Sequence, residues 1–274
     1  MTPRTFRAAL ATLLLGAGAG TVPAAPLWEL GLGAAALRLP DYRGADVSHG
    51  YLLPLPYVVY RGQWLRADRE GARAVLVDRP GWELNLSAHA SAPVRSRDNP
   101  ARAGMANLPA TVELGTKLTA RLWQAEDRSA QLDLLLPVRA VIAVSRSPHA
   151  VGAVAVPTLN LDLPRLAGWN VSVLTGADFG SRALHDHYYG VGAADATATR
   201  PAWTARGGYG GWHVLAAASR RFDRTWVGVY LRHDRLGGAV FADSPLVRRR
   251  TALSAGIGVS WVLAQSAEEA RADD

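Results

Sequence analysis

The segment from residue 82 to residue 91 alternates strictly between apolar and polar side chains. One side of the two-residue period holds Trp82, Leu84, Leu86, Ala88 and Ala90, and the other holds Glu83, Asn85, Ser87, His89 and Ser91. A helix would scatter these apolar residues around its whole circumference, whereas an extended strand places them on one face. The segment is therefore predicted to be a β-strand with one apolar face and one polar face.

The same alternation recurs along most of the chain. Further strands are predicted at 28–40, 51–60, 63–69, 72–79, 112–122, 131–144, 151–163, 169–177, 202–219, 227–231 and 253–263. The segment 202–219 fits either one long strand or a hairpin that turns near residues 207–211. A helical stripe is expected in no segment outside the N-terminal region and the last few residues. The total is about twelve strands, with a range of about 10–14, and single-chain bacterial barrels use even numbers.

Short turns and long loops alternate between these strands. Turns at 69–71, 126–128 and 223–224 are separated by polar segments at 41–50, 96–109, 180–200 and 236–250. A soluble sandwich would turn the polar faces to bulk water, whereas an outer-membrane barrel turns them to its lumen. The asymmetry of the connections, together with Trp residues near strand ends, favours the barrel. The predicted fold is an all-β antiparallel transmembrane barrel with long extracellular loops.

The N-terminus has the pattern of a secretory signal peptide. Arg4 and Arg7 precede a short apolar run, and small residues follow, with cleavage expected after Ala24. The alternative is a membrane anchor, but the run is shorter than the roughly 20 residues that a spanning helix needs. The expected organisation is a signal peptide at 1–24, a barrel at 25–264 and a charged tail at 265–274, with the mature chain in the cell outer membrane.

The composition narrows the choice of partners. The sequence has no Cys, so an exported chain would hold its fold without disulfides and without a lipid anchor on a cysteine. The net charge of +7 falls to +5 when Arg4 and Arg7 are removed. This modest basic excess suits outer-membrane lipid and lipopolysaccharide, and the chain has no basic run with interleaved aromatics of the kind that binds nucleic acid.

Charged side chains are expected on the lumen side of three strands. They are Glu83, Glu113, Lys117, Arg121 and Arg139. One interpretation is a plug of ion pairs that fills a narrow barrel, and the other is a binding or selectivity site for an anionic solute. The width of a twelve-strand lumen lies between filled and open barrels and does not decide between them.

The segment His185-Asp186-His187 is the main candidate for catalysis. Two His residues two positions apart lack the helical spacing of a zinc protease, and ligands for a closed metal site are not evident elsewhere. Ser244, between Asp243 and Pro245, fits a turn better than a nucleophile. The chain is therefore expected to be no enzyme and to use no cofactor or metal.

Several short strings resemble the MipA/OmpV family of Gram-negative outer-membrane proteins. They occur in order along the chain as Pro40-Asp41-Tyr42-Arg43-Gly44, Tyr60-Arg61-Gly62, Arg102-Ala103-Gly104-Met105, Leu136-Pro137-Val138-Arg139, Tyr188-Tyr189-Gly190-Val191 and Asp243-Ser244-Pro245-Leu246-Val247. The resemblance implies an outer-membrane barrel, in a family with one named member that joins a lytic transglycosylase to a peptidoglycan synthase. Other members resemble adhesins or envelope-stress proteins. The chain departs from the family in its charged tail after Leu263 and in Thr116, where Pro is expected.

Three functions remain open from the sequence. The first is a non-enzymatic envelope scaffold that links peptidoglycan enzymes to the outer membrane. The second is a small-solute channel with a charged lumen. The third is an outer-membrane hydrolase that uses the segment from His185 to His187.

Overall fold

A computed structural model describes residues 25–68 and 71–270, so the predicted signal peptide lies outside the described residues. Within these ranges the strands are β1 (Trp28–Pro40), β2 (Ser48–Arg61), β3 (Leu65–Asp68), β4 (Gly71–Arg79), β5 (Trp82–Ser91), β6 (Ala110–Gln124), β7 (Gln131–Val144), β8 (His149–Ala155), β9 (Thr158–Leu166), β10 (Trp169–Gly180), β11 (Gly208–Phe222), β12 (Thr225–Arg235) and β13 (Thr251–Gln265). The helix α1 (Arg182–Tyr189) and three short 3-10 turns (Ser96–Asp98, Pro100–Arg102 and Ala193–Asp195) lie in the connections.

The strands form one antiparallel barrel. Apart from β8 and β9, each pairs with its neighbours in chain order, and β13 closes the ring on β1. The first half of β7 pairs with β9 and its second half with β8, so β8 and β9 are two pieces of one wall strand interrupted at Val156 and Pro157. The described residues therefore form a barrel of twelve wall strands, which confirms the predicted fold class and strand number.

The two faces of the wall differ as the alternation predicts. Outward side chains are apolar and exposed, as for Leu32, Leu52 and Leu253, which are 63%, 79% and 57% exposed. Inward side chains include buried polar groups such as Glu29, Asn85 and Asp234. An exposed apolar belt around a barrel with a polar lumen is the arrangement of a membrane-spanning barrel. Within the described residues, no helix is both long and apolar enough to cross a membrane.

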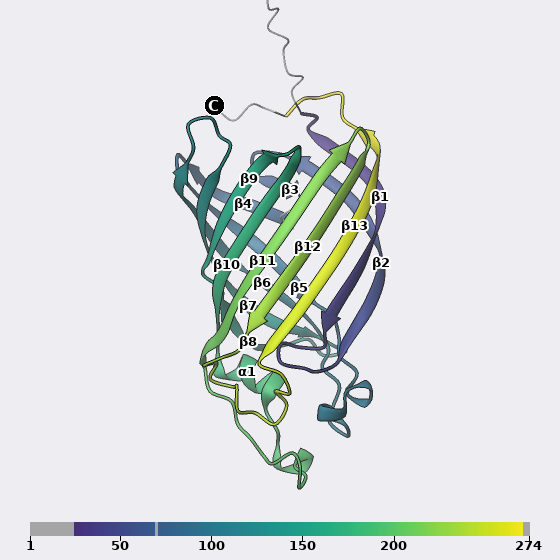
Figure 1. Cartoon of the computed structure of the whole chain (residues 1–274), viewed down its shortest axis with the longest axis vertical. Helices are drawn as coiled ribbons and strands as arrows, with labels where there is room; N and C mark the ends of the chain where they lie inside the picture. The colour runs from purple at the N-terminus through teal and green to yellow at the C-terminus, as the bar shows by residue number, and fades with distance from the viewer. Residues whose placement is uncertain (1–24, 69–70, 271–274) are drawn as a thin grey trace, which may run out of the picture.

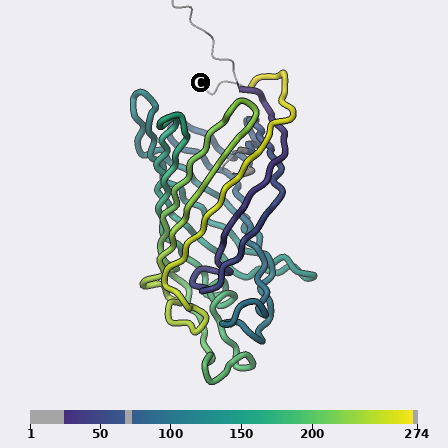
Figure 2. Tube along the Cα trace, turned by 45° about the vertical axis from the view of Figure 1, so that its right-hand side comes forward, coloured from purple at the N-terminus to yellow at the C-terminus, as the bar shows by residue number. Residues whose placement is uncertain are grey.

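The barrel has two unlike ends (Figure 1). Short connections such as 125–130, 167–168 and 223–224 lie at one end, here called the turn end. The described chain ends also meet there, where the amide N of Leu27 donates to Glu268 O at 2.8 Å and that of Ala270 to Ala25 O at 2.8 Å. Long connections lie at the opposite end, here called the loop end, which Figure 2 shows as a folded mass below the wall.

The structure corrects one expectation about the loops and decides one alternative about the strands. The segment 180–200, expected to lack a helix, contains α1, whose N-terminus is capped by Ser181 Oγ accepting from the amide N of Leu184 at 3.2 Å. Eight residues are too few to show a helical stripe, and the helix depends on burying Leu184, His185 and Tyr189. Of the two alternatives left open for the segment 202–219, the structure shows the single strand, because β11 runs unbroken from Gly208 to Phe222.

Candidate functional site: the loop-end cap and the charge network beneath it

The connections at the loop end pack into a cap. The cap comprises residues 41–47, 92–109, 181–207 and 236–250 and has a hydrophobic core that includes Tyr42, Val94, Leu108, Tyr189, Val191, Leu236, Phe241 and Leu246. The ring of Phe241 stacks on that of Tyr189, with centroids 3.7 Å apart and planes 7° apart. Because Leu236, Phe241 and Leu246 are almost fully buried, the cap is a folded lid over the barrel mouth.

Hydroxyl groups tie three of the four cap segments together. Tyr42 Oη donates to Leu246 O at 2.9 Å, and Tyr189 Oη donates to Arg43 O at 2.9 Å. Ser244 Oγ donates to Tyr189 O at 2.7 Å. Burial raises the pKa of Tyr42 to about 12 and also raises the pKa of Tyr189, so both hydroxyls stay protonated and keep donating.

A buried arginine joins the segment 92–109 to α1. The guanidinium of Arg102 donates to Tyr188 O at 3.1 Å, to Ala106 O at 3.3 Å and, through Nε, to Ser96 Oγ at 3.3 Å. Burial lowers the pKa of Arg102. Two of these acceptors belong to the segment 92–109 and one to α1. Arg102 therefore fixes the segment 92–109 against α1.

Most positions of the family strings converge on the cap. They are Tyr42, Gly44, Arg102, Gly104, Met105, Tyr188, Tyr189, Asp243, Ser244 and Pro245. Gly44 has a φ of 97°, and its carbonyl accepts from the amides of Arg248 and Arg249, so it joins two cap segments with a backbone shape that suits glycine. Arg61 and Gly62 lie instead at the turn end, where Arg61 donates to Glu29 Oε1 and to Pro26 O, both at 2.7 Å.

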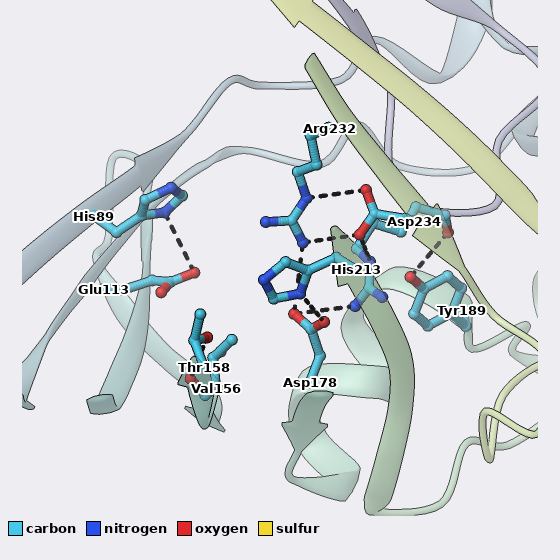
Figure 3. A network of polar contacts seen from close by, with 10 residues as sticks. His89, Glu113, Val156, Thr158, Asp178, Tyr189, His213, Arg232 and Asp234 are labelled. Atoms are coloured by element: carbon cyan, nitrogen blue, oxygen red, sulfur yellow. Dashed lines mark hydrogen bonds and ion pairs between the residues drawn. The ribbon is translucent and has the colours of Figure 1, made fainter. Parts of the chain in front are cut away.

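A charge network lies in the lumen directly beneath the cap (Figure 3). Asp178 Oδ2 is 2.9 Å from His213 Nδ1, and Asp178 Oδ1 is 3.3 Å from Arg43 Nη1. Asp234, which is 2% exposed, lies 2.9 Å from Arg43 Nε and 2.8 Å from Arg232 Nη2. Arg43 belongs to the cap and the other four residues to β10, β11 and β12, so the network couples the lid to the wall.

The donor set of this network could be mistaken for a metal centre. Ligand atoms of Asp178, His213 and Asp234 lie within 4.8 Å of one another. However, the guanidinium groups of Arg43 and Arg232 contact both carboxylates and neutralise them without a cation. The residues fit an ion-pair network better than a metal site.

The five lumen charges that were singled out from the sequence fall into separate groups. Glu113 pairs with Arg139 at 3.0 Å, and Arg121 lies 3.5 Å from Asp133. Glu83 pairs with Arg66 at 2.7 Å and with Arg73 at 3.3 Å, in the half of the barrel nearer the turn end. Lys117 lines a cavity in the middle of the lumen. All five face the lumen, but the structure does not bring them together into one site.

The strongest cluster beneath the cap was missed from the sequence. Asp178 continues the inward face of β10 after Ser172, Leu174 and Gly176, and Arg232 and Asp234 alternate with the outward Leu231. The alternation along these strands could have predicted that Asp178, Arg232 and Asp234 face the lumen. His213 was hidden because the sequence left open whether its segment turns.

The segment from His185 to His187 is used to build the cap. His185 Nδ1 lies 2.8 Å from Arg206 O, and its ring packs on Phe241 with centroids 4.7 Å apart. Asp186 Oδ1 accepts from the amide N of Ala205 at 2.9 Å. Burial lowers the pKa of both His185 and His187, which favours their neutral forms.

Comparison with solved structures returns other membrane barrels at low similarity. A structure titled "Bacterial polysaccharide outer membrane secretin" is 10% identical, with a TM-score of 0.39, covering 86% of this chain and 99% of that one. A FadL homologue from Pseudomonas aeruginosa is 9% identical, with a TM-score of 0.34, covering 86% and 90%. The outer membrane protein OprG from Pseudomonas aeruginosa is 8% identical, with a TM-score of 0.21, covering 87% and 94%.

The family comparison is more informative than these structures. No curated protein matches the chain. A family model described as "MltA-interacting protein MipA" matches residues 32–263, which include all but the outermost ends of the barrel wall and every segment of the cap. This protein therefore belongs to the MipA family.

Proposed function

We propose that this protein is a non-enzymatic barrel of the outer membrane that binds envelope partners at its rims. The observation that carries the proposal is the folded cap, whose buried core covers the barrel mouth at the loop end. A lumen crossed by ion pairs and covered by a packed lid is better suited to a fixed binding scaffold than to passage of solute.

The proposed partners are cell-wall enzymes. The family description names an interaction with MltA, and a lytic transglycosylase together with a peptidoglycan synthase would lie on the periplasmic side. Outer-membrane barrels place their short turns in the periplasm, so the turn end is the proposed docking face. The exposed turn 125–130 and Trp64, which is 75% exposed, are available there. Export by the N-terminal signal and contact with lipopolysaccharide belong to the same proposal.

A binding measurement tests the scaffold role. The full chain in nanodiscs is titrated with the purified lytic transglycosylase of the same envelope, and we expect saturable binding. Replacing residues 126–129 with a Gly-Ser linker should weaken binding at least tenfold if this turn contributes. The same four-residue replacement at 145–148, an exposed segment at the loop end, is the matched control and should change nothing. Absence of binding by the unaltered chain would contradict the scaffold role.

Two further measurements address the alternatives. In planar bilayers we expect no steady conductance, because the cap covers the mouth, and a steady ohmic conductance would favour a channel. We also expect no lipid- or peptide-cleaving activity. A cleavage activity abolished by both His187→Ala and Asp186→Ala would contradict the non-enzymatic proposal and favour a hydrolase.

A further inference from the structure

Within the part of the chain that the structure describes, one edge of β2 has no hydrogen-bonded neighbour over most of its length. On one side β2 pairs with β1 along its whole length, from Ser48 to Tyr60. On the other side, within the described residues, it pairs with β3 at Tyr60 and Arg61 alone. The edge from Ser48 to Val59 is therefore open, and these twelve residues span about 40 Å at 3.4 Å per residue.

The register shows which groups face this open edge. The amide N of Arg61 donates to Leu27 O at 2.8 Å, and the β1–β2 register runs without a shift. Odd-numbered residues of β2 therefore direct their amides to β1, and even-numbered residues direct theirs to the open edge. Pro54 and Pro56 occupy two central even positions, so the middle of the edge has no N–H groups to offer another strand.

The open edge is one side of a framed opening in the barrel wall, here called the side window. Toward the turn end it is bounded by the described strands β3, which ends at Asp68, and β4, which begins at Gly71. The facing side is β5 from Ala88 to Ser91, beyond its pairing with β4. The loop-end border of the window is formed by Asp41, whose carboxylate contacts His49 Nδ1 on β2 and Asn99 Nδ2 in the cap, each at 2.7 Å. Three interstrand spacings, about 14 Å, separate β2 from β5 where β3 and β4 lie between them.

Lumen-facing side chains beside the window are unusually exposed. Leu53 and Leu55 on β2 are 44% and 37% exposed, and the side chain of His89 on β5 is 62% exposed. His89 lies apart from the Asp178 network in Figure 3, on the far side of the lumen. These exposures agree with a wall that is open between β2 and β5.

The space behind the window contains a cavity whose lining is largely apolar. This cavity of about 480 Å³ in the middle of the lumen shares Leu55 with the window edge. Its lining includes Leu37, Leu135, Leu174 and Leu215 and, beside them, polar residues such as Lys117, Asn160 and Asp162. This volume lies within the range of about 300–1,000 Å³ that is typical of small-ligand pockets. Leucines facing the lumen are unexpected in a water-filled barrel, whose interior is normally polar.

The window opens on the lipid-facing belt of the barrel. The outward residues of the same β2 segment are Leu52, Pro54, Pro56 and Val58, with Leu52 79% and Val58 49% exposed. The edge is therefore continuous with the membrane interface of the wall, while the cap covers the aqueous route from the loop end. Because the two prolines oppose pairing with a strand, a hydrocarbon chain from the bilayer is the occupant that fits.

We propose that the side window admits an acyl chain of a lipid from the surrounding leaflet into the mid-lumen cavity. The window lies on the lipid-facing belt, Leu55 belongs to both its edge and the largely apolar cavity, and the edge is unsuited to another strand. This lipid site is independent of the proposed scaffold role, since it uses the wall and lumen instead of the turn end.

Photo-crosslinking tests the proposal, because the chain has no cysteine of its own. A single cysteine is introduced by Ala217→Cys, whose side chain lines the cavity, or by Ala216→Cys, whose side chain faces outward on the same strand. Each variant is labelled with a small alkyl diazirine and refolded as the full chain into vesicles of phosphatidylethanolamine and phosphatidylglycerol. After illumination, intact mass spectrometry reads the mass of whatever was captured.

We expect phospholipid adducts from both positions. Adding Leu53→Trp at the window should lower the phospholipid yield from position 217 at least fivefold, with no effect at position 216. The matched substitution Leu52→Trp, which points outward from the same edge, should leave both yields unchanged. Leu55→Phe replaces Leu53→Trp if that variant loses the heat-modifiable gel shift of a folded barrel.

Three outcomes would overturn the proposal. The first is phospholipid captured at position 216 but not at 217. The second is capture at 217 that is insensitive to folded window variants. The third is capture of a second copy of the chain at 217 in place of phospholipid.

Discussion

Removal of one aromatic ring should open the cap while the barrel wall persists. Phe241 is 1% exposed, stacks on Tyr189 and meets the His185 ring edge-on. A buried Phe→Ala change costs about 3–5 kcal/mol, to which the lost ring stacking contributes. A cost of about 4 kcal/mol raises the equilibrium constant for cap opening by a factor on the order of 10³, since 1.4 kcal/mol is tenfold.

Hydrogen exchange measures this opening directly. The amides of Ala242, Ser244 and Val247 bond within the cap, and we expect their exchange in Phe241→Ala to accelerate by up to that factor. Wall amides and the heat-modifiable gel shift should be unchanged. The control is Asp243→Ala in the same segment, because Asp243 is 86% exposed and its ion pair with Arg250 is worth at most about 1 kcal/mol. Acceleration below tenfold, or equal acceleration in the control, would refute a cap held by this core.

Other substitutions test the cap, its contact with the wall and the network beneath it. Because the folded pKa of Tyr42 is about 12 and its ordinary value is 10.0, stability present below pH 10 should be lost between pH 10 and 12, by about 3 kcal/mol. In Tyr42→Phe the stability lost between pH 10 and 12 should be smaller, as measured by thiol labelling of Ala242→Cys. An equal loss in this variant would contradict the attribution of the loss to ionisation of Tyr42. Gly152→Ala should lower stability in urea by about 3 kcal/mol, because φ is 138° and the new Cβ would lie 2.6 Å from a backbone N of α1. Gly81→Ala, with φ of 88° and open space around it, should cost about 1 kcal/mol, and equal costs would count against a fixed α1. Asp178→Asn should lower the stability measured in urea by about 2–4 kcal/mol, because two guanidinium groups lose a carboxylate partner. An unchanged midpoint of urea unfolding would show that the network does not stabilise the fold.

The barrel was predictable because the alternation of apolar and polar residues within each wall strand shows which face meets lipid. Leu253, Ile257 and Trp261 alternate with Ser254, Gly258 and Ser260, and the structure places them outward and inward accordingly. A period of two survives even where a strand is broken, so Val156 and Pro157 divided one predicted strand into β8 and β9 without changing the wall.

The cap was not predictable because its stability comes from contacts between distant loops. Tyr42 and Leu246 are 204 residues apart, and Tyr189 and Arg43 are 146 apart, yet each pair shares a hydrogen bond. Local patterning carries no information about such pairs, and loops that read as polar and solvated concealed a hydrophobic core. The side window was hidden for a related reason, since the short length of β3 matters only when its neighbours are known.

The seam between β1 and β13 has a consequence for biogenesis. It joins Glu29 to Gln265, so the cylinder can be sealed only after nearly the entire polypeptide has been delivered. At every earlier stage of assembly two strand edges are unpaired, and the insertion machinery must protect these edges from aggregation. A circular permutant that links residues 25 and 270 and starts in the 223–224 turn would move this seam to β11 and β12 while leaving the finished cylinder the same.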